Sequence, residues 1–218
     1  METLLIALPV LIFSVVVHEY AHGWMALRQG DQTAAMLGRL TFNPLPHLDP
    51  FGSILVPGLL ALTGSPILGW AKPVPVNPRN YRNYKRGDIL VSLAGVAANL
   101  ILAVVFTVLP ALTLWGLRAF PAFGASAPVV LQMLNYGIGI NIILILFNLL
   151  PIPPLDGSHV FYHLLPPHLA VRYREMGRFG FFILFGLLFF TGFRFLFVPT
   201  RMVHSSFVGV ARLLSGTL

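Results

Sequence analysis

A histidine-glutamate-x-x-histidine pattern near the N-terminus is the first feature of the chain that could perform chemistry. It consists of His18, Glu19 and His22, within an apolar run that starts near residue 3. On a helix, residues four apart share a face, so both imidazoles can reach one metal ion while Glu19 faces a metal-bound water. Zinc lowers the pKa of such a water from about 15.7 towards about 7, and a carboxylate can take the proton. The pattern predicts one Zn2+ per chain, with the two histidines as ligands and Glu19 as general base.

The surroundings of this motif are apolar enough for a helix that crosses a bilayer. Three ionisable groups in such a helix cost several kcal/mol unless a metal, a partner or water compensates. The alternative is a chance match, with the histidines hydrogen-bonded in a seam between helices. Background residue frequencies make a chance match rare in a chain of this length. We therefore interpret the motif as a metal site.

The composition predicts an all-α integral membrane protein. The chain is 56% hydrophobic and 10% charged, with a mean hydropathy of +0.81, whereas soluble domains carry about 25% charged residues. The net charge of +7 comes from basic residues in short loops between apolar runs, which is typical of membrane topology signals and not of nucleic-acid binding. The chain has no cysteine, which excludes disulfides, thiolate ligands and thiol nucleophiles.

Four apolar runs have about the 20 residues that a membrane helix needs. They cover residues 3–28, 87–112, 128–151 and 178–199. A fifth run, 51–70, is marginal because prolines and glycines interrupt it. The sequence predicts a single membrane-embedded domain over 1–218, a polytopic bundle of about four spanning helices. In this prediction 51–70 is re-entrant or marginal, within a loop region at 51–78.

The distribution of basic residues predicts the orientation. The loop from 72 to 86 carries five lysines and arginines, whereas 113–127 carries only Arg118. Because cytoplasmic loops are enriched in positive charge, the N-terminus is expected outside and the 72–86 loop in the cytoplasm. This arrangement requires 51–70 to dip into the bilayer and return.

Zinc needs a third protein ligand, and Asp156 is the predicted one. Most other acidic residues lie in polar or basic loops, where solvation or helix capping explains them. Asp156 instead follows the 128–151 run, after three prolines and before Gly157, which allows close backbone approach. The alternative is an N-cap for a short helix over 157–165.

The positions of His18 and Asp156 set a condition on the number of membrane crossings. His18 lies about 24 Å along a helix that starts near residue 3, close to its C-terminal end, and Asp156 also follows the C-terminal end of a helix. The two can share a metal only if their helices run in the same direction. The 87–112 helix alone gives that parity, while a crossing by 51–70 would separate them by about 30 Å. The charge distribution and the metal site thus agree on a re-entrant 51–70.

Three motifs together resemble the site-2 proteases, a family of intramembrane zinc metalloproteases. The residues that carry the resemblance are His18, Glu19 and His22, then Asn148, Pro151, Leu155, Asp156 and Gly157, and also Gly95 and Asn99. The resemblance implies two histidines and the aspartate as zinc ligands and the glutamate as base. It is closest to the compact prokaryotic branch without PDZ or CBS domains.

The resemblance also implies substrate or oxyanion roles for Asn148, Asn99 and Gly95. Val96 stands where many members have proline. The alternatives are that Asn148 is a polar residue between helices and that the Gly95–Asn99 pair is a seam of helix packing. His159 and His163 are also four apart, and we interpret them as surface residues or supports behind the ligands, because no carboxylate accompanies them in the sequence.

The resemblance implies hydrolysis of peptide bonds in transmembrane protein substrates, in regulated intramembrane proteolysis. The expected setting is the prokaryotic cytoplasmic membrane, with a multi-pass chain in the lipid bilayer and an active site towards the cytoplasm. The sequence does not determine the oligomeric state. Two alternatives are a membrane metal-ion transporter, which does not need Glu19 beside the ligands, and a catalytically inactive membrane adaptor, which does not need a base.

Overall fold

The computed structural model describes residues 2–62 and 71–216 of the 218-residue chain. The described residues form helices and loops without strands, which confirms the predicted all-α class. Three helices are long and apolar enough to cross a membrane. They are α1 (Glu2–Gln29), α4 (Tyr84–Ala119) and α5 (Ala127–Asn148).

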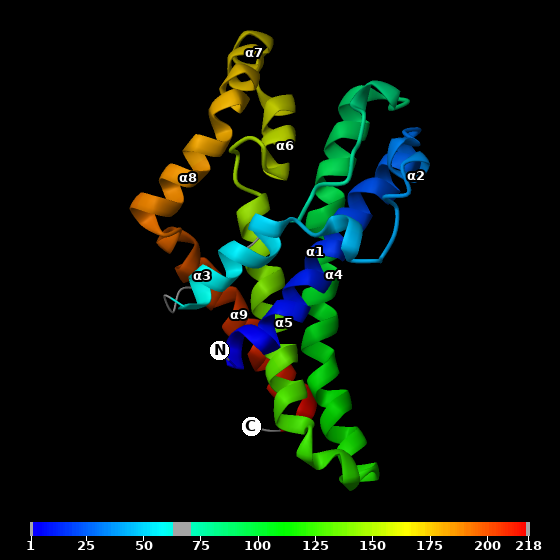
Figure 1. Cartoon of the computed structure of the whole chain (residues 1–218), viewed down its shortest axis with the longest axis vertical. Coiled ribbons are helices and arrows are strands. Elements are labelled where there is room, and N and C mark those ends of the chain that lie inside the picture. The colour runs from blue at the N-terminus through cyan, green and yellow to red at the C-terminus, as the bar shows by residue number, and fades with distance from the viewer. Residues whose placement is uncertain (1, 63–70, 217–218) are drawn as a thin grey trace.

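These three helices form the centre of the molecule. They pack pairwise against one another, and α4 runs antiparallel to α1 and α5 (Figure 1). Buried apolar side chains of α1 and α5 form one cluster with Ala71, and Ala103 of α4 packs with Ile138 and Ile142 of α5 in another. Helix α4 begins where the Asn83 side chain accepts a hydrogen bond from the Arg86 N–H, a common N-cap.

The other helices are shorter. The remaining α-helices are α2 (Thr33–Met36), α3 (Val56–Leu62), α6 (Asp156–Leu164), α7 (Pro167–Met176), α8 (Gly180–Thr191) and α9 (Arg194–Ser215). A π-helix covers Pro50–Leu55, and single 3-10 turns cover Leu45–His47, Pro78–Asn80, Pro121–Ala125 and Gly177–Phe179. Helix α9 packs against α4 and α5, whereas α6 packs on α4.

The run 178–199, predicted as a spanning helix, is not one continuous helix. It is interrupted between α8 and α9, and the helical stretches on the two sides of the break are bent by 80°. Gly192 and Phe193 both have φ of 55°, in the left-handed region, where glycine is tolerated best. The Gly192 N–H donates to the Leu188 carbonyl and ends α8. The left-handed cap therefore overrides the apolar composition that predicted a continuous helix.

Residues 47 and 72 lie side by side, although the marginal apolar run separates them in the sequence. The Lys72 N–H donates to the His47 carbonyl with an N–O distance of 2.8 Å. Within the run, the π-helix and α3 account for residues up to 62, and residues 63–70 lie outside the described part of the chain. The residues that precede and follow the run are therefore held together by a backbone hydrogen bond.

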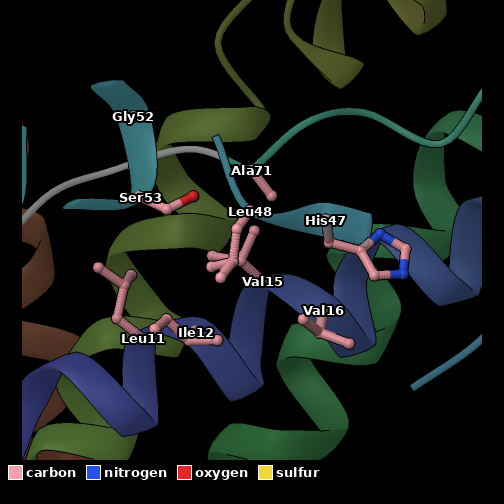
Figure 2. Close-up of a pocket in the computed structure, with 9 residues that line it drawn as sticks. All are labelled: Leu11, Ile12, Val15, Val16, His47, Leu48, Gly52, Ser53 and Ala71. Carbon is pink, nitrogen blue, oxygen red and sulfur yellow. The ribbon is translucent and has the colours of Figure 1, made fainter. Parts of the chain in front are cut away.

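His47 and its neighbours pack this segment on α1. Figure 2 shows Leu48 beside Val15 of α1, and Leu11 and Ser53 line the same cavity. His47 is fully buried, and its Nε2 lies 3.0 Å from the Thr41 carbonyl oxygen. The cavity lined by these residues measures about 10 Å³, about the least space that can hold one water. This packing anchors the start of the segment against the helix that carries the histidine motif.

Asp31 anchors the other side of the same connection. Its buried carboxylate accepts hydrogen bonds from the Asn77 N–H at 2.7 Å and from Asn80 Nδ2 at 2.8 Å. Burial would raise the pKa of Asp31, but these bonds and those from Thr33 outweigh it and hold the pKa below its usual range. Asp31 is therefore ionised at neutral pH, and its charge fixes the loop after α1 against the chain that leads into α4.

Candidate metal centre

Three predicted ligands converge at the end of α1. The Nε2 atoms of His18 and His22 lie 2.9 Å apart, and they lie 3.3 and 3.4 Å from the two carboxylate oxygens of Asp156. Ligand atoms of the three residues all lie within 4.8 Å of one another, and no other such group of three occurs among the residues that the structure describes. Helices α1 and α6 therefore bring together the two parts of the motif set predicted from sequence.

Hydrogen bonds fix the orientation of both imidazoles. His18 Nδ1 lies 2.6 Å from the Asn99 Oδ1, and His22 Nδ1 lies 2.7 Å from the Val91 carbonyl oxygen. Both partners are acceptors, so each neutral imidazole carries its proton on Nδ1 and directs a lone pair on Nε2 towards Asp156. Two nitrogen lone pairs and a carboxylate then face one point without a proton between them. A divalent cation satisfies such a donor set, and zinc prefers these ligand types.

One face of α4 holds the site from behind. The contributing residues are spaced three, four and four apart, which places them on one stripe of a helix: Asp88, Val91, Gly95 and Asn99. Gly95 lies directly against the imidazoles, since a Cβ there would be 2.5 Å from both His18 Cε1 and His22 Nε2. The structure therefore explains glycine at this position by close packing on the two histidines.

Asn99 belongs to a buried polar network that joins the three long helices. Its Nδ2 donates to the Asn141 Oδ1 of α5 at 2.8 Å, and Asn141 Nδ2 donates to the Ser14 hydroxyl of α1 at 2.9 Å. All three side chains are buried. Because Asn99 uses its amide group as donor, its carbonyl oxygen remains to accept from His18. The sequence analysis did not predict this network.

Glu19 lies one residue from His18 and faces the extended chain after residue 70. Its Oε2 accepts a hydrogen bond from the Val74 N–H at 2.7 Å. Val74 is itself buried, and Arg39 donates to the carbonyls of Lys72 and Pro73, which holds the same stretch. The carboxylate is therefore held beside the ligands by backbone that is remote in sequence.

Asp156 is the first residue of α6, and Leu155, not Asp156, occupies the N-cap position. The alternative reading of Asp156 as the cap of a helix over 157–165 is therefore wrong by one position. Gly157 fits against the Leu149 carbonyl, where a Cβ would collide with it. The turn can thus place the Asp156 carboxylate beside α1.

Asn148 lies at the last turn of α5, and its amide donates to the Leu144 carbonyl of its own helix at 3.0 Å. It is half-buried. This hydrogen bond uses one of the two N–H donors of the Asn148 amide. Its contact with a substrate stays a prediction.

A second cluster was misjudged at the sequence level. His159 Nδ1 and His163 Nε2 lie 3.1 and 2.8 Å from the two carboxylate oxygens of Asp88. The reading that no carboxylate accompanies this pair is wrong, because the carboxylate comes from α4, about seventy residues earlier. Asp88 is 4% exposed, so it is also not a solvated loop residue. The i, i+4 spacing of the histidines was the only signal in the sequence.

Comparison with known proteins decides the family. Residues 119–190 match the model of peptidase family M50. A Bacillus subtilis protein named "Putative zinc metalloprotease YwhC" is 41% identical over 182 residues, which cover 83% of this chain and 78% of that protein. The chain belongs to peptidase family M50. This is the site-2 protease family predicted from the motifs, and the chain is a zinc-dependent membrane peptidase.

Mycobacterial members of the family are longer. "Putative zinc metalloprotease Rip2" of Mycolicibacterium smegmatis is 37% identical over 160 residues, and its Mycobacterium tuberculosis counterpart is 35% identical over 166 residues. In both cases the match covers 72% of this chain and 55% of the relative, so the chain spans about half the length of these proteins. No solved structure matches the chain.

Proposed function

We propose that this M50 peptidase is an intramembrane zinc protease that hydrolyses peptide bonds in transmembrane protein substrates. The observation that carries the proposal is the convergence of His18, His22 and Asp156 within a bundle of apolar helices. The names of the relatives, all given as zinc metalloproteases, support the same chemistry.

The donor set supports one zinc ion per chain, held by His18, His22 and Asp156. Two imidazole nitrogens and one carboxylate would be the three protein ligands of a catalytic zinc ion, which would also bind water. When bound, zinc acts as a Lewis acid on the scissile carbonyl and lowers the pKa of the water beside it. The acceptors Asn99 Oδ1 and Val91 O keep each imidazole in the tautomer that presents Nε2 to the ion.

Glu19 is the proposed general base. It follows His18 directly on α1, and the Val74 N–H holds one of its carboxylate oxygens. The second oxygen can accept the proton of the attacking water and pass it to the leaving amine. The amide of Asn148 is the proposed donor for the developing charge on the substrate carbonyl.

A substrate helix must unwind locally before it can be cut, because its carbonyls are engaged in hydrogen bonds within the helix. The proposed orientation places the N-terminus outside and the active site towards the cytoplasm, in a prokaryotic cytoplasmic membrane. Water can reach a site near that face without passing through the whole bundle.

The proposal is tested by a comparison of wild type with Glu19→Gln, both purified in detergent. We expect Glu19→Gln to retain zinc at the wild-type stoichiometry and to lose cleavage of single-span substrates by at least about a hundredfold, the lower range for a general base. Bound zinc is measured by elemental analysis, and cleavage by gel and mass spectrometry. The matched ligand variant Asp156→Ala should lose zinc as well as activity.

Three results would contradict the proposal. Cleavage by Glu19→Gln at the wild-type rate would remove Glu19 as the base. Full zinc occupancy in Asp156→Ala would remove Asp156 as the third ligand. Zinc flux across proteoliposomes that persists in Glu19→Gln, without cleavage by wild type, would favour a transporter.

A further inference from the structure

The metal centre depends on a short helix that no long helix continues. Asp156 is the first of the nine residues of α6, which lies between a proline-rich turn and the loop before α7. Because Asp156 is at the end of this helix, a small rotation of α6 about its axis would carry the carboxylate away from His18 and His22. The helix therefore needs a fixed point further along its length.

The Asp88 carboxylate of α4 provides such a point. Both of its oxygens are engaged by histidines of α6, His163 at 2.8 Å and His159 at 3.1 Å. His163 is seven residues after Asp156, about 10 Å along the helix axis. Asp88 also belongs to the stripe of α4 that holds the two imidazoles of α1. Helix α4 thus supports all three ligands. It contacts His18 and His22 directly, and it holds α6, which carries Asp156.

The two histidines that contact Asp88 differ in burial and in packing. The His163 side chain is 6% exposed and lies between the rings of Tyr84 and Tyr162, with centroid distances of 5.5 and 5.0 Å. The His159 side chain is 46% exposed and lines a cavity of about 270 Å³ between α4, α6 and α7. We therefore expect the contact of Asp88 with His163 to hold α6 more strongly than its contact with His159.

The electrostatics of the cluster agree with an ion pair between Asp88 and the histidines of α6. The hydrogen bond to Asp88 raises the pKa of His159, and burial acts in the opposite direction. A buried carboxylate is costly unless it is paired and hydrogen-bonded, and here both oxygens are satisfied only while α6 keeps its place.

We propose that Asp88 is a positioning residue, which fixes the rotation of α6 through His163, and less strongly through His159, and thereby holds Asp156 at the zinc site. This inference rests on the proposed function, since it takes Asp156 to be a zinc ligand. Neither Asp88 nor His163 touches the metal or the substrate. Their effect should appear first in metal affinity and ligand geometry.

The test compares wild type with Asp88→Ala, His163→Ala and the double variant, all as full-length protein in detergent. Zinc affinity is measured by competition with a chelator, and the ligand geometry by the visible absorption of the Co2+-substituted protein. We expect each single variant to bind zinc about tenfold or more weakly, in line with the usual effect of groups behind metal ligands. The Co2+ spectrum should change, and the double variant should bind zinc no more weakly than Asp88→Ala alone, because Asp88→Ala already removes the partner of His163.

Two further variants and one control test the proposal more closely. His163→Gln keeps an N–H donor at a similar reach, so it should recover most of the affinity, and His159→Ala should lose less than His163→Ala. Thr107→Val is the matched control, because Thr107 is buried in α4 and, among the described residues, its hydroxyl donates to the Ala103 carbonyl of its own helix alone. Zinc affinity and the Co2+ spectrum should be unchanged in this variant.

The outcomes separate this inference from the proposed function. If the Co2+ spectrum of wild type responds to His18→Ala but not to Asp88→Ala or His163→Ala, the positioning role is overturned and the metal site stands. Equal losses of thermal stability in the metal-free single variants, without a change in affinity or spectrum, would also overturn it. A wild-type protein that binds no metal at His18 would overturn both.

Discussion

At the scale of single residues, the orientation of the ligands is determined by which atom of each side chain is already hydrogen-bonded. The Nδ1 atoms of His18 and His22 are occupied by acceptors, which leaves both Nε2 atoms to face Asp156. Gly95 is required because the imidazoles lie where a side chain would be. The predicted importance of Gly95 and Asn99 thus has a physical basis in contacts with the histidines. Direct roles of these two residues towards substrate stay predictions.

Gly95→Ala tests the close packing behind the imidazoles. The added methyl group would lie 2.5 Å from His18 Cε1 and His22 Nε2, so the rings must move. We expect zinc affinity to fall at least about tenfold, because ligand orientation is lost. The control is Gly116→Ala in the same helix, where no atom lies within 4 Å, and alanine there should stabilise the helix by about 0.5–1 kcal/mol. Wild-type zinc affinity in Gly95→Ala would show that the rings can shift without cost.

At the scale of elements, the extended stretch at 71–77 is as important to the site as the helices. It begins beside His47, where the Lys72 N–H donates to the His47 carbonyl, and it presents the Val74 N–H to Glu19. Asp31 and Arg39 hold its two ends by hydrogen bonds. The structure places this segment beside Glu19.

Val74→Pro tests this contact, because proline lacks the N–H and cannot donate. We expect kcat to fall about tenfold or more, since a hydrogen bond to a charged group contributes about 1.5–3 kcal/mol. Zinc content should not change, because Glu19 is not a ligand in the proposed mechanism. Val74→Ala keeps the N–H and is the control for the lost side chain. Equal kcat values for the proline and alanine variants would show that the hydrogen bond does not orient the base.

At the scale of the whole molecule, the question is how the chain crosses the membrane. Helices α1 and α5 run in one direction and α4 in the other (Figure 1). The ligand triad joins the C-terminal half of α1 to the first residue of α6, which follows α5 in the chain. The contact between His47 and Lys72 brings together the two sides of the 51–70 run. We propose on this basis that the run enters and leaves the bilayer at one face.

Single-cysteine labelling tests this topology directly, because the natural chain has no cysteine. Cysteines placed at the exposed positions Gln32, Arg79 and His168 should react with a membrane-impermeant maleimide only from the cytoplasmic side. A cysteine at Ala122 should react only from the outer side. Activity of each variant serves as the control for folding. Labelling of positions 32 and 79 from opposite sides would mean that the 51–70 run crosses the bilayer.

The sequence by itself determined the chemistry and the class of this protein. The spacing of His18, Glu19 and His22 is a local property of one helix, and the apolar composition predicts the membrane solvent, so neither needs a fold. The family predicted from these motifs is confirmed by the comparisons. Asp156 could be selected because few acidic residues compete with it and because the number of crossings limits which helix ends can meet.

Only the tertiary structure decided the supports of the site and the course of the last helices. The pairing of Asp88 with His159 and His163, the network of Asn99, and the contact of Val74 with Glu19 each join residues at least 42 positions apart. No local pattern encodes such contacts, since they depend on the packing of α4 against α1, α5 and α6 and on the position of the 71–77 stretch beside α1. The break at Gly192 was missed for a different reason. Hydropathy measures composition, whereas two left-handed residues are enough to end a helix.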